Sequence, residues 1–279
     1  MGKDKPESSL MFAKLSPDAS KVAYVSGNNL YMDDLVSGKS APLTKDGSLR
    51  MINGTFDWVY EEEFGCRDGF RWSPDGKSIA YWQLDAKKIR NFLMINNTDS
   101  IYAYTIPVEY PKVGEDPSSA RIGVVNIATA ETTWLKVPGS TVQNYIPRME
   151  WIPNSNEIIL QQINREQNES KMFVADPSTG NATEIYKESD KAWIDAVDGW
   201  DWLNNGKEFL YESERDGWKH YYRVSRDGKK TTLITKGNNL TILPFPHPAN
   251  TIHLSRQHIS SLSLYAWVSW LGLSHLHPC

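Results

Sequence analysis

Three consecutive glutamates, Glu61 to Glu63, follow an aromatic segment in the sequence DWVYEEEFGC at residues 57–66. Neighbouring carboxylates repel each other, so a run of this kind usually marks a solvated acidic turn. Two of the carboxylates could instead face one cation, because a primary ammonium group has three N–H donors that suit two carboxylates. Composition alone favours the solvated turn, and the geometry of the backbone must decide between the two.

A strand and a helix would place these side chains differently. In a strand, adjacent side chains point to opposite faces, and two neighbouring glutamates could not share a ligand. In a helical turn they lie about 100° apart and can rim one pocket. Asp57 is a residue type that favours the N-cap position of a helix. We therefore expect a short helix over residues 57–64, carried on a loop.

The elements around this segment follow a repeating pattern of strand, turn and apolar strand. The spacings between successive turns are 57, 79 and 51 residues, and two of the three are close to the length of a propeller blade, about 50 residues. The turns begin at Ser16, Ser73, Ile152 and Leu203.

The repeat predicts an all-β fold. The sequence SPDG at residues 73–76 is typical of a type I turn that joins two strands as a hairpin. The strand after it is apolar on both faces, as expected where blades stack around a channel. We therefore predict a partial β-propeller of about four to five blades of four-stranded antiparallel sheet. The alternative, a β-sandwich, lacks a repeat of this length. The longest spacing contains an insertion over residues 86–120, which we expect to run over the surface.

Several function classes find no support in the 279 residues. The net charge of −4 argues against a nucleic-acid partner. No run of 18 apolar residues is present that would span a membrane. The two cysteines, Cys66 and Cys279, form no metal-binding motif, and we expect neither a metal nor a cofactor. A G-x-S-x-G nucleophile motif is absent, so we assign no catalytic residue within this sequence.

The segment DWVYEEEF, followed by RWSPDGKSIAYWQLD, resembles the dipeptidyl peptidase IV family of serine exopeptidases. INNTDSIYAYTIPVEYPKVGEDPSSARIGVV and ESERDGWKHYYRVSRDGKKTTLITKG are similar to the bacterial branch of the same family. The resemblance covers about residues 8–240. It implies an eight-bladed N-terminal propeller, a C-terminal α/β-hydrolase domain, and removal of dipeptides after Pro or Ala from peptide N-termini.

The resemblance also implies roles for the acidic segment. The second and third glutamates of the motif, Glu62 and Glu63, would bind the free α-amino group of the substrate. Glu61 would support them, and Asp57, Trp58 and Tyr60 would fix the short helix; these four residues complete the motif.

The two charged residues after the helix have two interpretations. Arg67 and Asp68 either line the same pocket or form a pair that braces the loop. The family's Ser/Asp/His triad would lie in the hydrolase domain, so we expect this chain by itself to hydrolyse nothing.

The sequence changes character near its C-terminus. No acidic residue follows Asp227, and residues 247–279 contain five of the six histidines and Arg256 as their single charged residue. We therefore divide the chain into a partial propeller over residues 1–246 and an aberrant tail over residues 247–279. We interpret the tail as the product of a reading-frame error or a truncation, and we expect it not to complete a regular blade.

These observations lead to one hypothesis and one alternative. The hypothesis is the substrate-gating propeller of a serine exopeptidase, whose partners are a peptide with a free N-terminus and the hydrolase domain. The intact protein would be a homodimer, exported to the periplasm or the cell surface, although residues 1–10 show no signal peptide. The alternative is a non-catalytic propeller that binds a protein or peptide as a scaffold.

Overall fold

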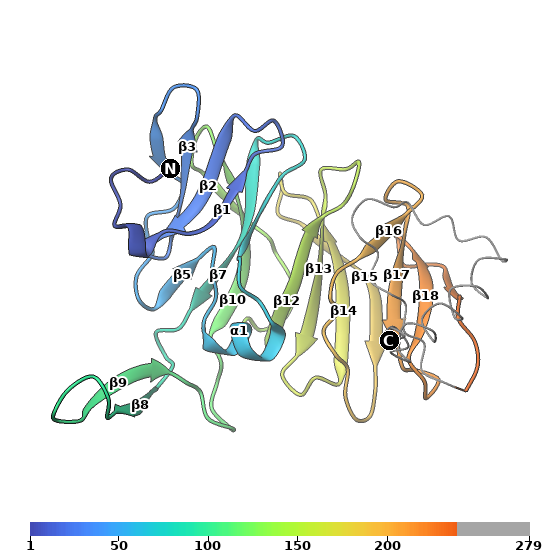
Figure 1. Cartoon of the computed structure of the whole chain (residues 1–279). Helices are drawn as coiled ribbons and strands as arrows, with labels where there is room; N and C mark the ends of the chain where they lie inside the picture. Colours follow the sequence, from blue (N-terminus) through green and yellow to red (C-terminus); the bar gives the residue numbers. More distant parts are fainter. Residues whose placement is uncertain (239–279) are drawn as a thin grey trace, which may run out of the picture.

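Four antiparallel sheets lie in a row in the computed structural model, which describes residues 1–238 (Figure 1). The fold class predicted from the repeat is confirmed, because three of these sheets have four strands and the second has five only through a split first strand, as in the blades of a partial propeller. The C-terminal tail, residues 247–279, lies outside the described residues, as does the end of the predicted propeller segment.

The first, third and fourth sheets are simple meanders, in which each strand pairs with the next along the chain. A short 3₁₀ helix, η1 (Glu7–Ser9), precedes the first sheet. The strands of the first sheet are β1 (Met11–Leu15), β2 (Lys21–Ser26), β3 (Asn29–Asp34) and β4 (Ser40–Pro42). Those of the third are β12 (Asn144–Trp151), β13 (Ile158–Asn164), β14 (Glu169–Ala175) and β15 (Ala182–Ser189). Those of the fourth are β16 (Asp201–Leu203), β17 (Glu208–Ser213), β18 (His220–Ser225) and β19 (Thr231–Leu233).

The second sheet departs from this plan because its first strand is split into two pieces. Both pieces pair with the next strand of the sheet, β7 (Ser78–Asp85). The first piece, β5, pairs with residues 83–85, and the second piece, β6, pairs with residues 79–81. The chain between the pieces leaves the sheet and forms the helix α1 (Trp58–Phe64). The strands of this sheet are β5 (Met51–Asn53), β6 (Phe70–Trp72), β7 (Ser78–Asp85), β10 (Ser119–Asn126) and β11 (Thr132–Trp134).

The strand β7 shows how the sheets hold together. Ile79 and Tyr81 lie in an apolar cluster with residues of β2 and β3, whereas Ala80 and Trp82 lie in a second cluster with residues of β12 and β13. Successive side chains of a strand point to opposite faces, so one strand contributes to two inter-sheet cores. The prediction of a strand buried on both faces is therefore confirmed, and neighbouring sheets are stabilised by shared apolar area.

Two indole groups also link neighbouring sheets. Each of the four predicted turns joins the first two strands of a sheet, and a tryptophan directly precedes three of these turns. Trp72 Nε1 donates to the backbone oxygen of Lys14 at 3.0 Å, and Trp151 Nε1 donates to that of Arg71 at 3.1 Å. Each bond joins the first strand of one sheet to the first strand of the sheet before it.

The predicted insertion forms a two-stranded hairpin, β8 (Asn91–Asn96) and β9 (Tyr104–Glu109), which projects away from the sheets (Figure 1). Arg50 contacts the base of this hairpin. Its Nε lies 3.4 Å from the carboxylate of Glu109, and its Nη1 donates to the backbone oxygen of Ile89 at 2.8 Å. The expected surface excursion therefore takes the form of a paired hairpin. Its exposed apolar side chains include Phe92, Leu93, Met94, Ile95, Tyr104 and Ile106. Within residues 1–238, no helix is long and apolar enough to cross a membrane.

Leu160 tests whether the core between the second and third sheets stabilises the fold. It is fully buried in the cluster that contains Trp82. Because a cavity would replace its side chain, Leu160→Ala should lower the free energy of unfolding by about 2–5 kcal/mol. Urea denaturation measures this value. The exposed Val36 provides the control, and Val36→Ala should change the value by less than about 0.5 kcal/mol. Equal effects of the two substitutions would contradict the assignment of this core.

Candidate functional site

The predicted helix is present as α1, and its local sequence explains its two ends. Asp57 is the N-cap, and its carboxylate accepts the backbone N–H of Tyr60 at 3.1 Å. Gly65 ends the helix in the left-handed region, with φ of 61°, where glycine carries no steric penalty. The N–H of Cys66 bonds back to the carbonyl of Tyr60 at 3.0 Å. The helix therefore has only seven residues.

Tyr60 fixes the helix against the third sheet. Its side chain is completely buried, and its hydroxyl accepts the backbone N–H of Ile146 in β12 at 3.0 Å. Its ring stacks on Phe56, with centroids 5.6 Å apart. Phe64, at the other end of the helix, packs on Tyr145 with centroids 5.0 Å apart. The buried face of the helix thus belongs to the junction between the second and third sheets.

Two further contacts hold the first turn of the helix from the side of the insertion. The hydroxyl of Ser118, just before β10, donates to the carboxylate of Asp57. Trp58 packs on Tyr110, just after β9, with ring centroids 4.4 Å apart. Neither Ser118 nor Tyr110 could be found from the sequence, because each lies more than 50 residues from its partner.

The three glutamates have different surroundings. Glu61 accepts a hydrogen bond from Arg67, with 2.9 Å between Oε1 and Nη1. Glu62 and Glu63 are both exposed, and neither side chain makes a hydrogen bond or an ion pair within residues 1–238. They occupy consecutive positions of α1, about 100° apart around the helix axis. Their convergence on one ligand stays a prediction.

Arg67 and Asp68 do not pair with each other in the described chain, so the bracing pair proposed from the sequence is not the arrangement found. Arg67 is bound to Glu61 and is 72% exposed. Asp68 accepts from Lys14 in β1 and from Arg71 in β6, the latter at 3.0 Å. The loop is therefore braced through Asp68 to two sheets, and Lys14 is a partner that sequence reasoning missed.

The electrostatics of the site exclude some chemistry. Burial raises the pKa of the Cys66 thiol to about 11, so this thiol stays protonated at neutral pH and is a poor nucleophile. Burial also raises the pKa of Asp57, against the hydrogen bonds from Ser118 and Tyr60 that lower it. No group of three or more His, Cys, Asp or Glu side chains that could hold a metal ion occurs in residues 1–238. The exposed glutamates therefore remain as groups that can bind an organic cation.

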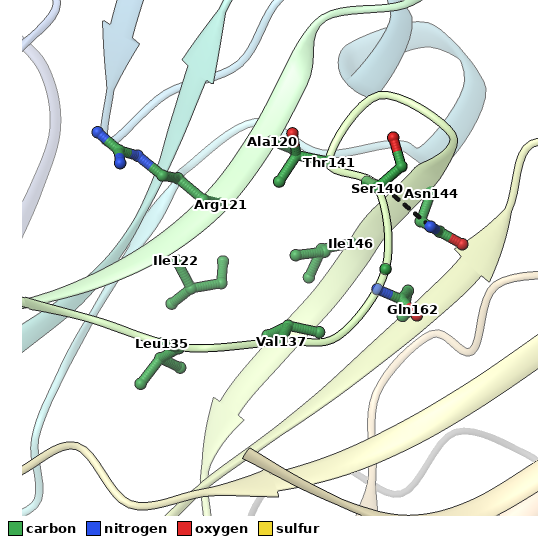
Figure 2. A pocket seen from close by; sticks show the side chains of 11 residues that line it. Ala120, Arg121, Ile122, Leu135, Val137, Ser140, Thr141, Asn144, Ile146 and Gln162 are labelled. Atoms are coloured by element: carbon green, nitrogen blue, oxygen red, sulfur yellow. Dashed lines mark hydrogen bonds between the residues drawn. The ribbon is translucent and has the colours of Figure 1, made fainter. Parts of the chain in front are cut away.

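A small pocket between β10 and β12 is a weaker candidate (Figure 2). Its floor is apolar, with Ile122, Leu135 and Ile146, and no carboxylate, histidine or cysteine lines it. Its single charged side chain, Arg121, is engaged elsewhere, because it donates to Gln83 and lies 3.6 Å from the ring centroid of Trp134. We therefore assign the candidate site to the glutamates of α1.

Comparison with known proteins extends these observations. The sequence model described as "Dipeptidyl peptidase IV (DPP IV) N-terminal region" matches residues 2–251. Dipeptidyl peptidase 4 of Arthroderma otae is 29% identical over 242 residues, which are 82% of this chain and 31% of that protein. A probable dipeptidyl peptidase 4 of Aspergillus flavus is 26% identical over 273 residues, 91% of this chain and 35% of that protein.

Solved structures give the same picture. The crystal structure of Porphyromonas gingivalis dipeptidyl peptidase 4 matches with a TM-score of 0.78 and 31% identity, over 82% of this chain and 33% of that one. A putative dipeptidyl aminopeptidase IV from Bacteroides ovatus matches in fold, with a TM-score of 0.73 and 23% identity, over 86% of this chain and 36% of that one. The chain spans about a third of the length of these relatives.

The carboxyl group of Asp57, the N-cap of α1, makes the stability of the folded chain depend on pH. Because burial raises its pKa, the folded state holds this proton more tightly than the unfolded state. The contribution of the group to stability is therefore full below its ordinary value of 3.8 and is lost as the pH rises through the raised pKa. Asp57→Asn keeps an oxygen for the Tyr60 N–H and removes the titration.

We expect the Asp57→Asn variant to lose less stability than the unmodified chain between pH 4 and pH 7, measured by urea denaturation across that range. Asp57→Ala removes the cap as well as the titration, so it should be about 1 kcal/mol less stable than Asp57→Asn at every pH. The exposed Glu131 serves as control, since Glu131→Gln should leave the pH profile unchanged. If Asp57→Asn follows the profile of the unmodified chain, the buried carboxyl does not control it.

Proposed function

This chain belongs to the dipeptidyl peptidase IV family, whose N-terminal propeller region it represents, and from that premise we propose that Glu62 and Glu63 bind the free α-amino group of a peptide substrate. One observation supports this proposal above the others. Of the acidic residues at 61, 62, 63 and 68, Glu61 and Asp68 are bound to internal cations, whereas Glu62 and Glu63 face solvent without such a partner in residues 1–238. A primary ammonium can donate to both carboxylates.

The rigidity of the helix explains why this pair would determine specificity. Tyr60 holds α1 to the third sheet and Asp57 holds it to Ser118, just before β10, so the carboxylates have a fixed position relative to the propeller. A substrate held by its α-amino group would then present one particular peptide bond at a fixed distance. An internal segment of a protein has no α-ammonium to offer, and its binding would leave both carboxylates without a partner.

The chemical step is part of the same proposal. We place it in an α/β-hydrolase domain, where a serine would accept the acyl group of the dipeptide and water would then release it. The products would be N-terminal dipeptides with Pro or Ala in the second position. The propeller would contribute recognition and gating, and we propose the periplasm or cell surface as the compartment.

The β8–β9 hairpin supports a further element of this proposal, a homodimer of the intact protein. An isolated two-stranded hairpin is only marginally stable in water, and this one exposes apolar side chains from both of its strands. The strand β8 contains no proline and no charge, so its free edge could pair antiparallel with the same strand of a second copy.

The first test concerns the glutamates. In the full-length enzyme, Glu62→Gln and Glu63→Gln should each lower kcat/KM for an Xaa-Pro anilide by roughly 30- to 1,000-fold. A charge-assisted bond to a partly desolvated ammonium contributes on the order of 2–4 kcal/mol, which corresponds to this loss. Hydrolysis of the N-acetylated substrate should change little, because it has no ammonium to lose.

Glu61→Gln is the matched control, since Arg67 already neutralises this carboxylate. We expect it to lower kcat/KM by less than about fivefold, in line with the small energy of an exposed ion pair. Near-parental kcat/KM in both the Glu62 and Glu63 variants would mean that these residues form a solvated acidic turn and that the ammonium binds elsewhere.

The dimer is tested separately. Ile95 is 68% exposed near the turn end of β8, and Ile95→Lys should shift the full-length enzyme toward the monomer by placing a charge in the interface. Analytical ultracentrifugation measures the distribution. Val36→Lys, at an 88% exposed position in the turn between β3 and β4, should leave this distribution unchanged. If the Ile95 variant has the same monomer–dimer distribution as the unmodified enzyme, the hairpin is not part of the dimer interface.

A further inference from the structure

Strand β12 contains an extra residue at the place where α1 packs against it. Positions 145 and 148 of β12 pair with positions 163 and 161 of β13. Three steps along β12 therefore match two steps along β13, which is the pattern of a β-bulge. Pro147, which has no N–H to donate to a sheet, lies in this bulge. Bulges change the direction of neighbouring side chains and are frequent next to active sites, and this one lies beside the helix that carries the glutamates (Figure 1).

The ring of Tyr145, at the start of the bulge, is held against α1. Its centroid lies 5.0 Å from that of Phe64 and 6.1 Å from that of Tyr60. Tyr60 and Phe64 are four residues apart and therefore share one face of the helix. Inside the bulge, the N–H of Ile146 donates to the hydroxyl of Tyr60 at 3.0 Å. The half-buried ring of Tyr145 thus has a fixed place at the junction of the helix and the third sheet.

The hydroxyl of Tyr145 is an available donor. It makes no hydrogen bond within residues 1–238, whereas the hydroxyl of Tyr60 has a partner, as is usual for a buried tyrosine. Burial raises the pKa of Tyr145, against the charge of Arg165, which lowers it. The charges of Glu63 and Asp57 raise this pKa further. The hydroxyl therefore keeps its proton at neutral pH and can donate a hydrogen bond.

Helical spacing places Glu63, rather than Glu62, beside this hydroxyl. Glu63 lies three positions after Tyr60, so it borders the face of α1 on which Tyr145 packs. Glu62 lies two positions after Tyr60, a spacing at which helical side chains do not face each other. It lies four positions after Trp58 and so belongs to the other side of the helix. The two glutamates therefore have different neighbours.

Arg165, whose charge also acts on the Tyr145 hydroxyl, is already bound. It donates to the carboxylate of Asp116 at 2.9 Å and to the backbone oxygen of Glu115. Asp116 also accepts from Gln143 at 3.0 Å. This guanidinium therefore ties the insertion to the third sheet, whereas the Tyr145 hydroxyl has no such partner in residues 1–238.

We propose that Tyr145 is a positioning residue of the ammonium site, and that its hydroxyl donates to the carboxylate of Glu63 when the α-amino group of a substrate binds. A carboxylate can accept several hydrogen bonds, so one oxygen of Glu63 accepts from Tyr145 while the other accepts from the ammonium. Hydrogen bonds of a catalytic site often tighten only when the substrate is bound.

The benefit of this bond lies in the freedom of the Glu63 side chain. Glu63 is exposed in the free chain, so it loses rotamer freedom when it binds a ligand. A hydroxyl fixed by two ring contacts limits the positions that its carboxylate can take. Glu63 is then the fixed carboxylate of the pair, and Glu62 is the one that adjusts to the ligand. This inference rests on the proposed binding role of Glu62 and Glu63.

The first test is Tyr145→Phe in the full-length enzyme, which keeps the ring on α1 and removes the hydroxyl alone. We expect it to lower kcat/KM for an Xaa-Pro anilide about tenfold, through KM more than kcat, because a hydrogen bond to a charged group is lost. Hydrolysis of the N-acetylated substrate and the urea midpoint should not change. Tyr102→Phe, at an 83% exposed position between β8 and β9, is the matched control and should have no effect.

A double-mutant cycle separates the positioning of Glu63 from a general structural role. Alanine replaces each glutamate, because a glutamine oxygen could still accept from the hydroxyl. With Glu63→Ala, adding Tyr145→Phe should change kcat/KM by less than about twofold. With Glu62→Ala, the same change should still lower kcat/KM about tenfold. Equal losses in the two backgrounds, or a parental kcat/KM in Tyr145→Phe alone, would overturn the proposal.

Failure of this inference differs from failure of the proposed function. If Glu62→Gln and Glu63→Gln lower kcat/KM and Tyr145→Phe does not, the ammonium site stands and Tyr145 is a packing residue of α1. If both glutamate variants keep near-parental kcat/KM, the proposed function and the role of Tyr145 are overturned together.

Discussion

The hydrogen bond between the hydroxyl of Tyr60 and the backbone N–H of Ile146 is the interaction on which the candidate site depends. It joins a helix that interrupts one sheet to the first strand of the next, in surroundings where neither group has access to water. A buried N–H without an acceptor would be costly, so the bond restricts where the helix can lie. The cap at Asp57 and the glycine at position 65 then limit the helix to seven residues, and its outer face carries the glutamates.

Charge pairing around the helix separates structural acids from available ones. Asp68 binds Lys14 and Arg71 and ties the loop after the helix to two sheets. Glu61 is bound to Arg67, while Glu62 and Glu63 remain exposed. Such a division suits a binding site. The carboxylates that pair with a cation of the chain brace the backbone, and the carboxylates without such a partner can bind a ligand.

Local signals in the sequence predicted much of this architecture, and long-range contacts account for what they could not predict. The turns at Ser73 and its equivalents set the four-strand repeat, and the Asp57 cap predicted the helix, because both depend on residues a few positions apart. The splitting of the first strand of the second sheet was not predicted, since the two short pieces β5 and β6 are recognisable only through their pairing with β7. Likewise, Ser118 lies 61 positions from Asp57 and Lys14 lies 54 from Asp68, distances over which one sequence carries no pairing signal.

A crystal structure of the full-length enzyme with a bound Xaa-Pro dipeptide product would test the central claim most directly. The decisive quantity is the distance from the dipeptide's α-amino nitrogen to the carboxylate oxygens of Glu62 and Glu63. The account predicts that both carboxylates lie within about 2.7–3.2 Å of that nitrogen, as in charge-assisted hydrogen bonds. A dipeptide whose ammonium is bound by other groups, with Glu62 and Glu63 still pointing into solvent, would contradict it.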